Sequence, residues 1–579
     1  MKASKNRSRR FSTQRVIQTA SLLLFLYLLS TVLFPLSSSL PGTLPAELFL
    51  RLDPLVALAI PVSARELIGN LVPGLLVLLS AIFFGRVFCG YLCPFGTTLD
   101  FMRILLNKIF GTRPRRDKAR AESAGPVPGG LKYLLLAIIL GSAVIGVNQS
   151  HWLAPIPLIT RFYALLLHPL LLLAAKSGLE AAKTLATILP EEMNPAWLQY
   201  MQIPARHFYT LYFLLLFFAS LFWLERLKPR FWCSRLCPAG ALLSLLDALP
   251  RRLFPFLPRW GRMTSACINC GSCAAACPTG AIEPAGEKTR AGECIACRHC
   301  AEVCPAGAVR FGFSASSGSL CSTRLPSRRF FLAGAGAGVL LSGTGLSGTG
   351  NLLKDVGQGS LWSSSCIRPP GSLPEPDFLK RCLRCGECMK ACPSNGLQPT
   401  WFAAGVDGAF SPILIPRRGP CEPDCNVCGL VCPTGAIQAL ALPDKQQAKL
   451  GTAVVMQERC LAYAEGKRCV VCQEVCPYGS IRLEQPPGRP GAVPSGVPAP
   501  VVNPVKCFGC GYCEHHCPVR IPAVVVYPLN ALRFTGTNYR QLAQQAGLEL
   551  NPVSGDAPPE DYAGPPDNSA GGLPPGFTE

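Results

Sequence analysis

The chain has 579 residues, 30 of them cysteine; 49% of the residues are hydrophobic and only 15% are charged. This composition excludes a chain that is disordered throughout and favours membrane segments over a purely soluble fold. Lysine and arginine number 55 against 34 acidic residues, a net charge of +21. The placement of these charges has to decide between nucleic acid, a membrane surface and an acidic protein as the partner.

Four apolar stretches in the first half are long enough to cross a bilayer at about 1.5 Å per residue. They are residues 16–35, 67–84, 131–147 and 208–224. A fifth stretch, residues 162–175, is shorter and contains Pro169, which favours an interfacial or re-entrant helix. If the fifth stretch did span, the side on which the next domain lies would invert.

Basic residues flank these stretches unevenly. They are Lys2, Lys5, Arg7, Arg9, Arg10 and Arg15 before the first stretch, Arg103, Lys108, Arg113, Arg115, Arg116, Lys118 and Arg120 between the second and third, and Arg226, Lys228, Arg230 and Arg235 after the fourth. The positive-inside rule therefore places these segments in the cytoplasm. Much of the positive charge thus lies where membrane topology accounts for it, so we expect no nucleic-acid partner.

Two short cysteine motifs follow the second and fourth stretches. They are Cys89 and Cys93-Pro94, and Cys233 and Cys237-Pro238. An i, i+4 pair lies on one helix face, so two pairs at one membrane surface would supply four thiolates. Two interpretations stay open, a further iron–sulfur cluster or structural or redox-active dithiols.

The next cysteines form two runs with the spacing C-x2-C-x2-C-x3-C-P, which predicts cubane [4Fe–4S] clusters. The runs are Cys267, Cys270, Cys273, Cys277 and Cys294, Cys297, Cys300, Cys304. In two-cluster ferredoxins the fourth cysteine of each run binds the cluster of the other run. We therefore expect Cys304 to join the first three cysteines of run one, and Cys277 to join those of run two.

Four more runs follow in the second half, and each ends in Cys-Pro. They are Cys382, Cys385, Cys388, Cys392; Cys421, Cys425, Cys428, Cys432; Cys460, Cys469, Cys472, Cys476; and Cys507, Cys510, Cys513, Cys517. The repetition of six such runs favours iron–sulfur clusters over zinc knuckles. It predicts six [4Fe–4S] clusters, or seven if the two short motifs at Cys89 and Cys233 together bind another. The long first gaps of the inner two runs resemble four-cluster electron-transfer subunits, in which the first of the four runs pairs with the last and the inner two pair together. Cys321 and Cys366 lack this spacing and are expected to be ordinary thiols.

Ser327-Arg328-Arg329-Phe330, followed by a glycine-rich apolar segment, separates the two cysteine-rich halves. This pattern is typical of a twin-arginine export signal, and the alternative is a charged linker that stays inside. With the signal in use, the first cysteine module is cytoplasmic and the second is periplasmic.

Residues 1 to about 320 resemble the NapH-like (MauN-like) membrane ferredoxin family, with four spans, two C-x3-C-P motifs and a double-cluster tail. Residues from about 325 resemble the NapG-like (MauM-like) exported ferredoxins, including Arg368-Pro369-Pro370-Gly371 and Leu373-Pro374-Glu375. The resemblance implies two parts of a quinol dehydrogenase that feeds a periplasmic reductase, fused here into one chain.

The predicted architecture is an α-helical membrane domain of about four transmembrane helices plus α+β ferredoxin-like domains. Its parts are a membrane domain (1–250), a two-cluster domain (260–315), a signal and linker (324–350), a four-cluster domain (366–540) and a disordered tail (551–579). The location is the inner membrane, and the expected partners are the quinone pool and an exported redox enzyme or cytochrome.

The predicted function is electron transfer, with quinol oxidation as the candidate activity and a membrane redox sensor or metalloenzyme maturation factor as the alternative. The sequence has no nucleophile–base, nucleotide-binding or haem motif, so the catalytic residues are unknown. Candidates for taking up quinol protons are His151, His168, His207 and Glu66, because histidine titrates near neutral pH. For each of them a solvated or hydrogen-bonded side chain is the simpler interpretation.

Overall fold

The computed structural model forms two compact units. Unit 1 comprises Met1–Ile415, Asn426–Leu440 and Arg533–Thr537, and unit 2 comprises Pro416–Cys425, Ala441–Leu532 and Asn538–Glu579. The residues that the structure describes are 13–32, 44–111, 130–186, 201, 206–226, 228–253, 259–264, 267–282, 289–290, 292–314, 321–322, 327–343, 366–401, 403–485 and 497–552. The basic residues expected before position 13 and at 113–120, and the tail from 553, lie outside this part.

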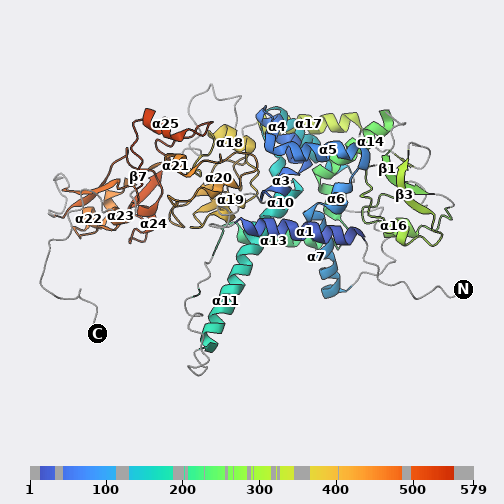
Figure 1. The fold of residues 1–579 in the computed structure, drawn as a ribbon, viewed down its shortest axis with the longest axis horizontal. Helices are drawn as coiled ribbons and strands as arrows, with labels where there is room; N and C mark the ends of the chain where they lie inside the picture. Colours follow the sequence, from blue (N-terminus) through green and yellow to red (C-terminus); the bar gives the residue numbers. More distant parts are fainter. Residues whose placement is uncertain are drawn as a thin grey trace. The chain divides into compact units, whose positions relative to one another are not determined.

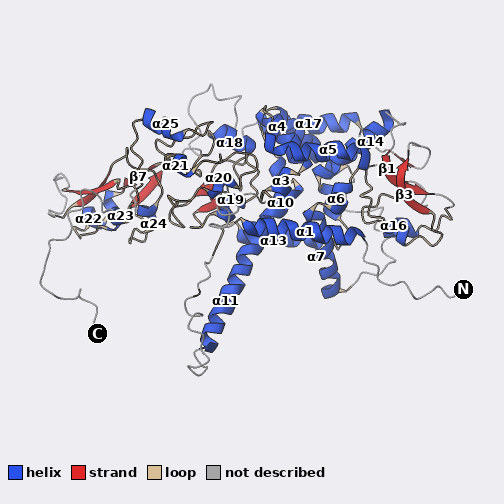
Figure 2. Ribbon diagram, in the orientation of Figure 1, coloured by secondary structure: helices blue, strands red, loops and turns tan. Residues whose placement is uncertain are grey.

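The first part of unit 1 is a bundle of helices, here called the helical body (Figure 1, Figure 2). Its helices are α1 (Thr13–Thr31), α3 (Leu48–Arg51), α4 (Pro54–Ala64), α5 (Val72–Phe84), α6 (Val87–Tyr91), α7 (Pro94–Phe110), α9 (Leu131–Val144), α10 (Pro155–Arg161), α11 (His168–Ala186), α13 (Leu211–Leu224), α14 (Pro238–Leu253) and α17 (Arg328–Gly343). The shorter turns are η1 (Gly69–Leu71), η3 (Ser150–Trp152), and the π-helical η4 (Phe162–Leu167) and η6 (Trp232–Leu236).

Several helices of the body begin at residues that suit a helix start. Asp53 precedes α4 and accepts hydrogen bonds from the backbone N–H groups of Leu55 (2.9 Å) and Val56 (3.2 Å), which satisfies the first free donors. Pro94 and Pro238 are the first residues of α7 and α14, where a missing N–H costs nothing. Both helices therefore start directly after the cysteine of a Cys-Pro pair.

Helices occupy all four apolar stretches, but most are short. By length and composition, one described helix is able to cross a membrane, the continuous Pro155–Thr184, while those at 54–64, 69–84, 131–144 and 211–224 are shorter apolar helices. The long helix includes residues 162–175, which we expected to be a separate interfacial segment, and its α11 part extends away from the helical body (Figure 1). Pro169 does not end this long helix. It lies in the first turn of α11, just after the π-helical turn η4, and a helix tolerates proline in its first turn.

The cysteine-rich parts are built from short helices, loops and two-stranded sheets. In unit 1 these are β1 (Arg259–Thr264), α15 (Ser272–Ala276), β2 (Thr289–Arg290), α16 (His299–Glu302), β3 (Val309–Ser314), β4 (Cys321–Ser322), α18 (Glu375–Arg381), α19 (Glu387–Ala391), β5 (Leu397–Pro399), β6 (Pro412–Leu414) and α20 (Val427–Leu430). In unit 2 they are α21 (Leu442–Lys445), β7 (Thr452–Val455), η8 (Gln457–Arg459), α22 (Leu461–Ala464), α23 (Val471–Glu474), β8 (Ile481–Glu484), β9 (Ala499–Val502), α24 (Tyr512–His515), β10 (Val524–Tyr527) and α25 (Tyr539–Gln545).

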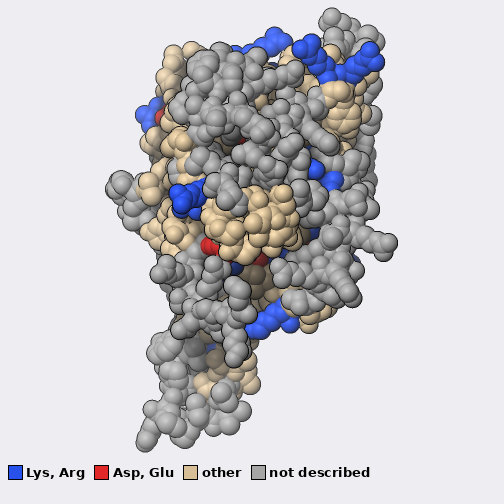
Figure 3. Space-filling view, turned by 90° about the vertical axis from the view of Figure 1, so that its right-hand side faces the viewer, with Lys and Arg blue, Asp and Glu red and all other residues tan. Residues whose placement is uncertain are grey.

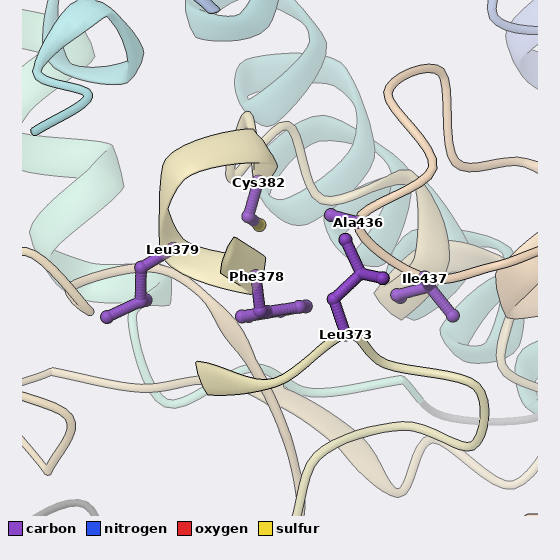
Figure 4. Close-up of a cluster of buried hydrophobic side chains, with 6 residues drawn as sticks. All are labelled: Leu373, Phe378, Leu379, Cys382, Ala436 and Ile437. Carbon is purple, nitrogen blue, oxygen red and sulfur yellow. The ribbon is translucent and has the colours of Figure 1, made fainter. Parts of the chain in front are cut away.

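The strands described in the structure pair only in twos: β1–β3, β5–β6, β7–β10 and β8–β9 are antiparallel, and β2–β4 is parallel. Sheets this small cannot supply a large apolar core. In unit 1, Cys382 packs instead among Leu373, Phe378, Leu379, Ala436 and Ile437, as Figure 4 shows.

Candidate iron–sulfur sites

The first cysteine module of unit 1 brings together one predicted set of ligands completely. Cys294, Cys297 and Cys300 line a pocket with Cys277, the fourth cysteine of the preceding run. Cys273 and Cys304 pack in a common apolar cluster with Ala274, Ile282 and Val309. The pocket therefore joins Cys277 to the second run as expected, while the joining of Cys304 to the first run stays a prediction, because the same cluster also contains Cys277 and Cys300.

The second module has a different pairing from the expected one. In unit 1, Cys382, Cys385 and Cys388 line a pocket with Cys432. The first of these four runs thus meets the second run, and the expected partner, the run of Cys507, lies in unit 2.

Unit 2 repeats this arrangement. Cys507, Cys510 and Cys513 line a pocket with Cys476, and Cys460 and Cys517 share an apolar cluster. The third run therefore meets the fourth. The pockets thus combine neighbouring runs, for which closing a short loop costs less entropy than closing a long one. The second run also reaches the fourth, because the backbone N–H of Cys421 donates to the carbonyl of Cys510 at 2.8 Å. Of the remaining cysteines, Cys392 and Cys428 belong to unit 1, and Cys421 and Cys425 to unit 2.

All four regularly spaced runs share one backbone conformation. The second and fourth residues after the first cysteine have positive φ in every case: Asn269 and Gly271, Ala296 and Arg298, Arg384 and Gly386, and Gly509 and Gly511. Left-handed residues at alternate positions turn the chain tightly and aim backbone N–H groups into the turn. This wraps three cysteines around one centre.

Backbone N–H groups also donate to the fourth cysteines. Ala281 donates to Cys277 Sγ at 3.3 Å, Ile437 to Cys432 Sγ at 3.4 Å and Ser480 to Cys476 Sγ at 3.4 Å. Such bonds stabilise thiolate sulfur and raise cluster potentials. Pockets lined by four cysteines, with N–H donors at sulfur, fit [4Fe–4S] clusters.

The cysteines that follow the second and fourth apolar stretches lie together in the helical body. Cys89, Cys93, Cys233 and Cys237 are all buried and each interacts electrostatically with others of the four. Burial, followed by the neighbouring Cys89, raises the pKa of Cys237 to about 12, so a proton or a metal has to balance the thiolate charge. No three His, Cys, Asp or Glu side chains in the described part of the chain are grouped to hold a single metal ion.

A reciprocal pair of arginines holds the two cysteine motifs together. Arg86 Nη2 donates to the carbonyl of Cys233 at 3.0 Å, and Arg230 Nη1 donates to the carbonyl of Cys89 at 2.8 Å. Each arginine stands three residues before the first cysteine of its own motif and reaches the other motif. Both are fully buried, and Arg230 is paired with Asp100 at 2.6 Å. The sequence signal that we missed is the repeat R-x2-C-x3-C-P-x-G at 86–96 and 230–240.

Glu293 connects this arginine pair to the first ferredoxin module. It precedes Cys294, pairs with Arg86 at 2.9 Å and also pairs with Lys132. Burial raises the pKa of Glu293, but Lys132 and Arg86 lower it more, so the carboxyl stays charged. Tyr91 donates to the carbonyl of Ala296 at 2.9 Å. The four buried thiols therefore adjoin the pocket of Cys277, Cys294, Cys297 and Cys300.

Replacing Arg230 by Met should destabilise the chain strongly, because the carbonyl of Cys89 and the carboxylate of Asp100 lose their partner. Arg230 is buried but Asp100 is 35% exposed, so the cost should lie between the about 3–5 kcal/mol of breaking a fully buried pair and the about 0–1 kcal/mol that an exposed pair contributes. The matched control is Lys183→Met, which removes the exposed pair with Glu180. The melting temperature of the detergent-solubilised chain should be lower for Arg230→Met than for Lys183→Met. Equal melting temperatures would contradict a stabilising role of Arg230.

The candidate proton acceptors lie in different surroundings. His151 is fully buried, and Arg384 Nη1 donates to its Nδ1 at 2.8 Å. Burial, Arg384 and Arg161 hold the pKa of His151 well below 6.5, which disfavours it as a proton acceptor; the hydrogen-bonded side chain that was the simpler interpretation is the one that the structure shows. Glu66 is 59% exposed in an ion pair with Arg381. His207 is exposed, and its carbonyl accepts a hydrogen bond from Asn395.

Comparison with known families supports the sites. A 4Fe-4S binding domain model matches residues 68–113, 209–256 and 427–443, and a 4Fe-4S dicluster domain model matches 266–308 and 467–521. Both cysteine motifs of the helical body fall in the matched segments. The fold and these sites define an iron–sulfur electron-transfer protein of the ferredoxin type.

The chain is also similar in sequence to curated ferredoxin-type proteins. The "methylamine utilization ferredoxin-type protein MauM" of Methylophilus methylotrophus is 39% identical over 172 residues, 29% of this chain and 72% of the relative. MauM of Methylorubrum extorquens is 35% identical over 36% of this chain and 92% of the relative, and "ferredoxin-type protein NapG" of Escherichia coli is 35% identical over 35% and 88%. The chain belongs to the family of ferredoxin-type proteins MauM and NapG.

This result confirms the expected resemblance of the second half. The expected resemblance of residues 1 to about 320 to the NapH-like (MauN-like) family has no support from these relatives. No solved structure matches the chain.

Proposed function

We propose that the protein is a membrane-bound iron–sulfur electron carrier that oxidises quinol and delivers the electrons to an exported redox enzyme or cytochrome. Oxidation of a quinol releases two electrons and two protons. A [4Fe–4S] cluster, when bound at the cysteine sites, supplies a one-electron centre. The protein therefore has to take the electrons one at a time.

The observation that carries this proposal is that two cysteine sites contact opposite ends of one helix, α1. At its start, the side-chain amides of Gln14 and Gln18 both donate to the carbonyl of Gly90 at 3.0 Å. Gly90 is packed so closely that a Cβ there would lie 2.3 Å from the carbonyl oxygen of Ile295, which follows Cys294. The first ferredoxin module is thereby fixed at this end.

At the other end of α1, Lys390 Nζ donates to the carbonyls of Leu29 and Val32. Lys390 lies between Cys388 and Cys392, in the second cysteine half. The 19 residues of α1 extend about 28 Å at 1.5 Å per residue, close to the roughly 30 Å of bilayer hydrocarbon. α1 is long enough but not apolar enough to count among the helices able to cross a membrane by composition, so it is its length that supports a location in the cytoplasmic membrane with one cysteine module on each side.

Other contacts hold the second cysteine half to the same end of the helical body. Asn148 donates to the carbonyl of Lys380 at 2.9 Å, and Gln149 donates to Asp407 at 2.8 Å. Both follow α9, the third apolar stretch, which the positive-inside rule directs outward. On the face turned toward β1 and β3, Lys and Arg cover more of the described surface than Asp and Glu (Figure 3). This charge supports a cytoplasmic place for the first module.

The four buried thiols next to the first module are proposed as the ligands of a seventh cluster. Arg86 and Arg230 would hold the motifs in register and offset the negative charge of the thiolates. The sulfur of Cys237 already accepts the backbone N–H of Gly240 at 3.3 Å, the kind of bond found at the ferredoxin-type sites. The alternative for these thiols is a pair of dithiols.

Quinol added to anaerobic membranes that contain the protein should bleach the visible absorbance of its clusters. The rival donor is a reduced cytoplasmic ferredoxin, which would reach the first module directly. Bleaching by reduced ferredoxin but not by quinol would overturn quinol oxidation. If neither donor bleaches the clusters, a sensor or maturation role becomes the better explanation.

A further inference from the structure

Helix α17, which begins at the arginine pair, buries one face in the helical body. Ser327 caps its start, because Ser327 Oγ accepts the backbone N–H of Phe330 at 3.3 Å. Gly334, Gly338 and Ser342 are buried and follow one another at intervals of four residues. The opposite face is apolar and exposed, with Leu332 and Leu340 each 69% accessible. A lipid-facing helix that packs on a neighbour shows this division.

The neighbour is α9, and the two backbones touch. A Cβ added to Gly338 would lie 2.3 Å from the carbonyl oxygen of Ile138, and one added to Gly141 of α9 would lie 2.3 Å from that of Ala335. A Cβ on Gly334 would lie 2.8 Å from Leu134 Cδ1. Small residues four apart allow this approach between membrane helices.

The two helices are parallel. Phe330 lies against Gly130, Gly334 against Leu134 and Gly338 against Ile138, so the residue numbers rise together along both helices. The third apolar stretch, to which α9 belongs, is expected to run from the cytoplasm outward. A helix parallel to it takes the chain in the same direction, and its 16 residues extend about 24 Å.

We propose that Arg328–Gly343 remains in the mature protein as a membrane helix bound to α9, rather than being removed as an export leader. The two cysteine-rich halves then stay one polypeptide, with α17 as the connection between them. The membrane location rests on the proposed function, whereas the pairing of α17 with α9 rests on the contacts within unit 1.

The first test is the integrity of the full chain. With a different epitope tag at each terminus and expression in a bacterium that has twin-arginine export, both tags should be detected on one membrane-bound species near 62.0 kDa. Two species, each with one tag, would overturn the proposal. If two fragments are found and they still accept electrons from quinol, the retention of α17 is refuted and the proposed function stands. If one intact chain is found and it does not accept electrons from quinol, the proposed function is refuted and the retention of α17 stands.

The second test is glycine replacement with a matched control in the same helix. Gly338→Leu should cause loss of intact membrane-bound chain, because the side chain meets the α9 backbone. Gly336→Leu should leave the amount unchanged, because no atom lies within 4 Å of a Cβ at Gly336. Gly334→Ala is the milder variant, since its nearest neighbour is the end of the Leu134 side chain, and it should lower the melting temperature of a chain that still folds. Equal behaviour of the variants at 334, 336 and 338 would overturn the pairing.

Discussion

Anaerobically purified protein is expected to carry about 24 iron atoms per chain, four for each of six clusters, or about 28 if the four buried thiols hold a seventh. The physical basis is that four cysteines and backbone N–H donors surround a common centre in both units. Iron near eight per chain, the content of a single two-cluster module, would contradict it.

Joint replacement of Cys93 and Cys237 by Ser should distinguish the two totals. Loss of about four iron atoms would assign the seventh cluster, and an unchanged iron content would favour dithiols. The control is Cys366→Ser, because Cys366 is buried outside every run and its thiol donates to the carbonyl of Ala403. This control should leave the iron content as it is.

Reporter fusions are expected to separate the two cysteine halves by compartment. A fusion at residue 320 should be active only with a cytoplasmic reporter, and one at residue 540 only with an exported reporter. Replacing Arg328 and Arg329 by Lys should abolish export of the second reporter, because the export machinery reads the arginine pair and not only its charge.

The cytoplasmic fusion at 320 serves as the internal control and should be unaffected by the two lysines. A cytoplasmic reporter active at both positions would mean that the arginine pair is only a linker. Since lysine preserves the charge, loss of export cannot be attributed to the positive-inside rule.

The sequence predicted those parts of the sites that depend on local spacing. Cys294, Cys297 and Cys300 lie within one tight turn, so their convergence follows from spacing, and the joining of Cys277 follows from the short connection between two runs. The pairing of Cys382 with Cys432 was mispredicted, because it depends on which segments fold together and not on the gaps inside a run.

The cross-contacts in the helical body could not be predicted from local patterns. Arg86 and Cys233 are 147 residues apart. The repeated arginine before each motif would have suggested a pair, but not that each arginine binds the opposite motif. Likewise, the sequence around His151, which follows an apolar stretch, predicts an interfacial residue. Its burial against Arg384, which is far away in the sequence, could not be predicted from that stretch.

The left-handed turns of the cysteine runs constrain the order in which the protein is built. Ala296, Arg298 and Arg384 have φ values of 54°, 59° and 50°, a conformation that costs a residue with a side chain roughly 1–2 kcal/mol. In the finished protein, ligation of the neighbouring cysteines offsets this cost; a chain without iron and sulfide has nothing comparable to hold the turns. Under the proposed export of the second half, which contains Arg384, we expect cluster insertion to precede transport, and the supply of clusters on the cytoplasmic side then sets how much protein reaches its final form.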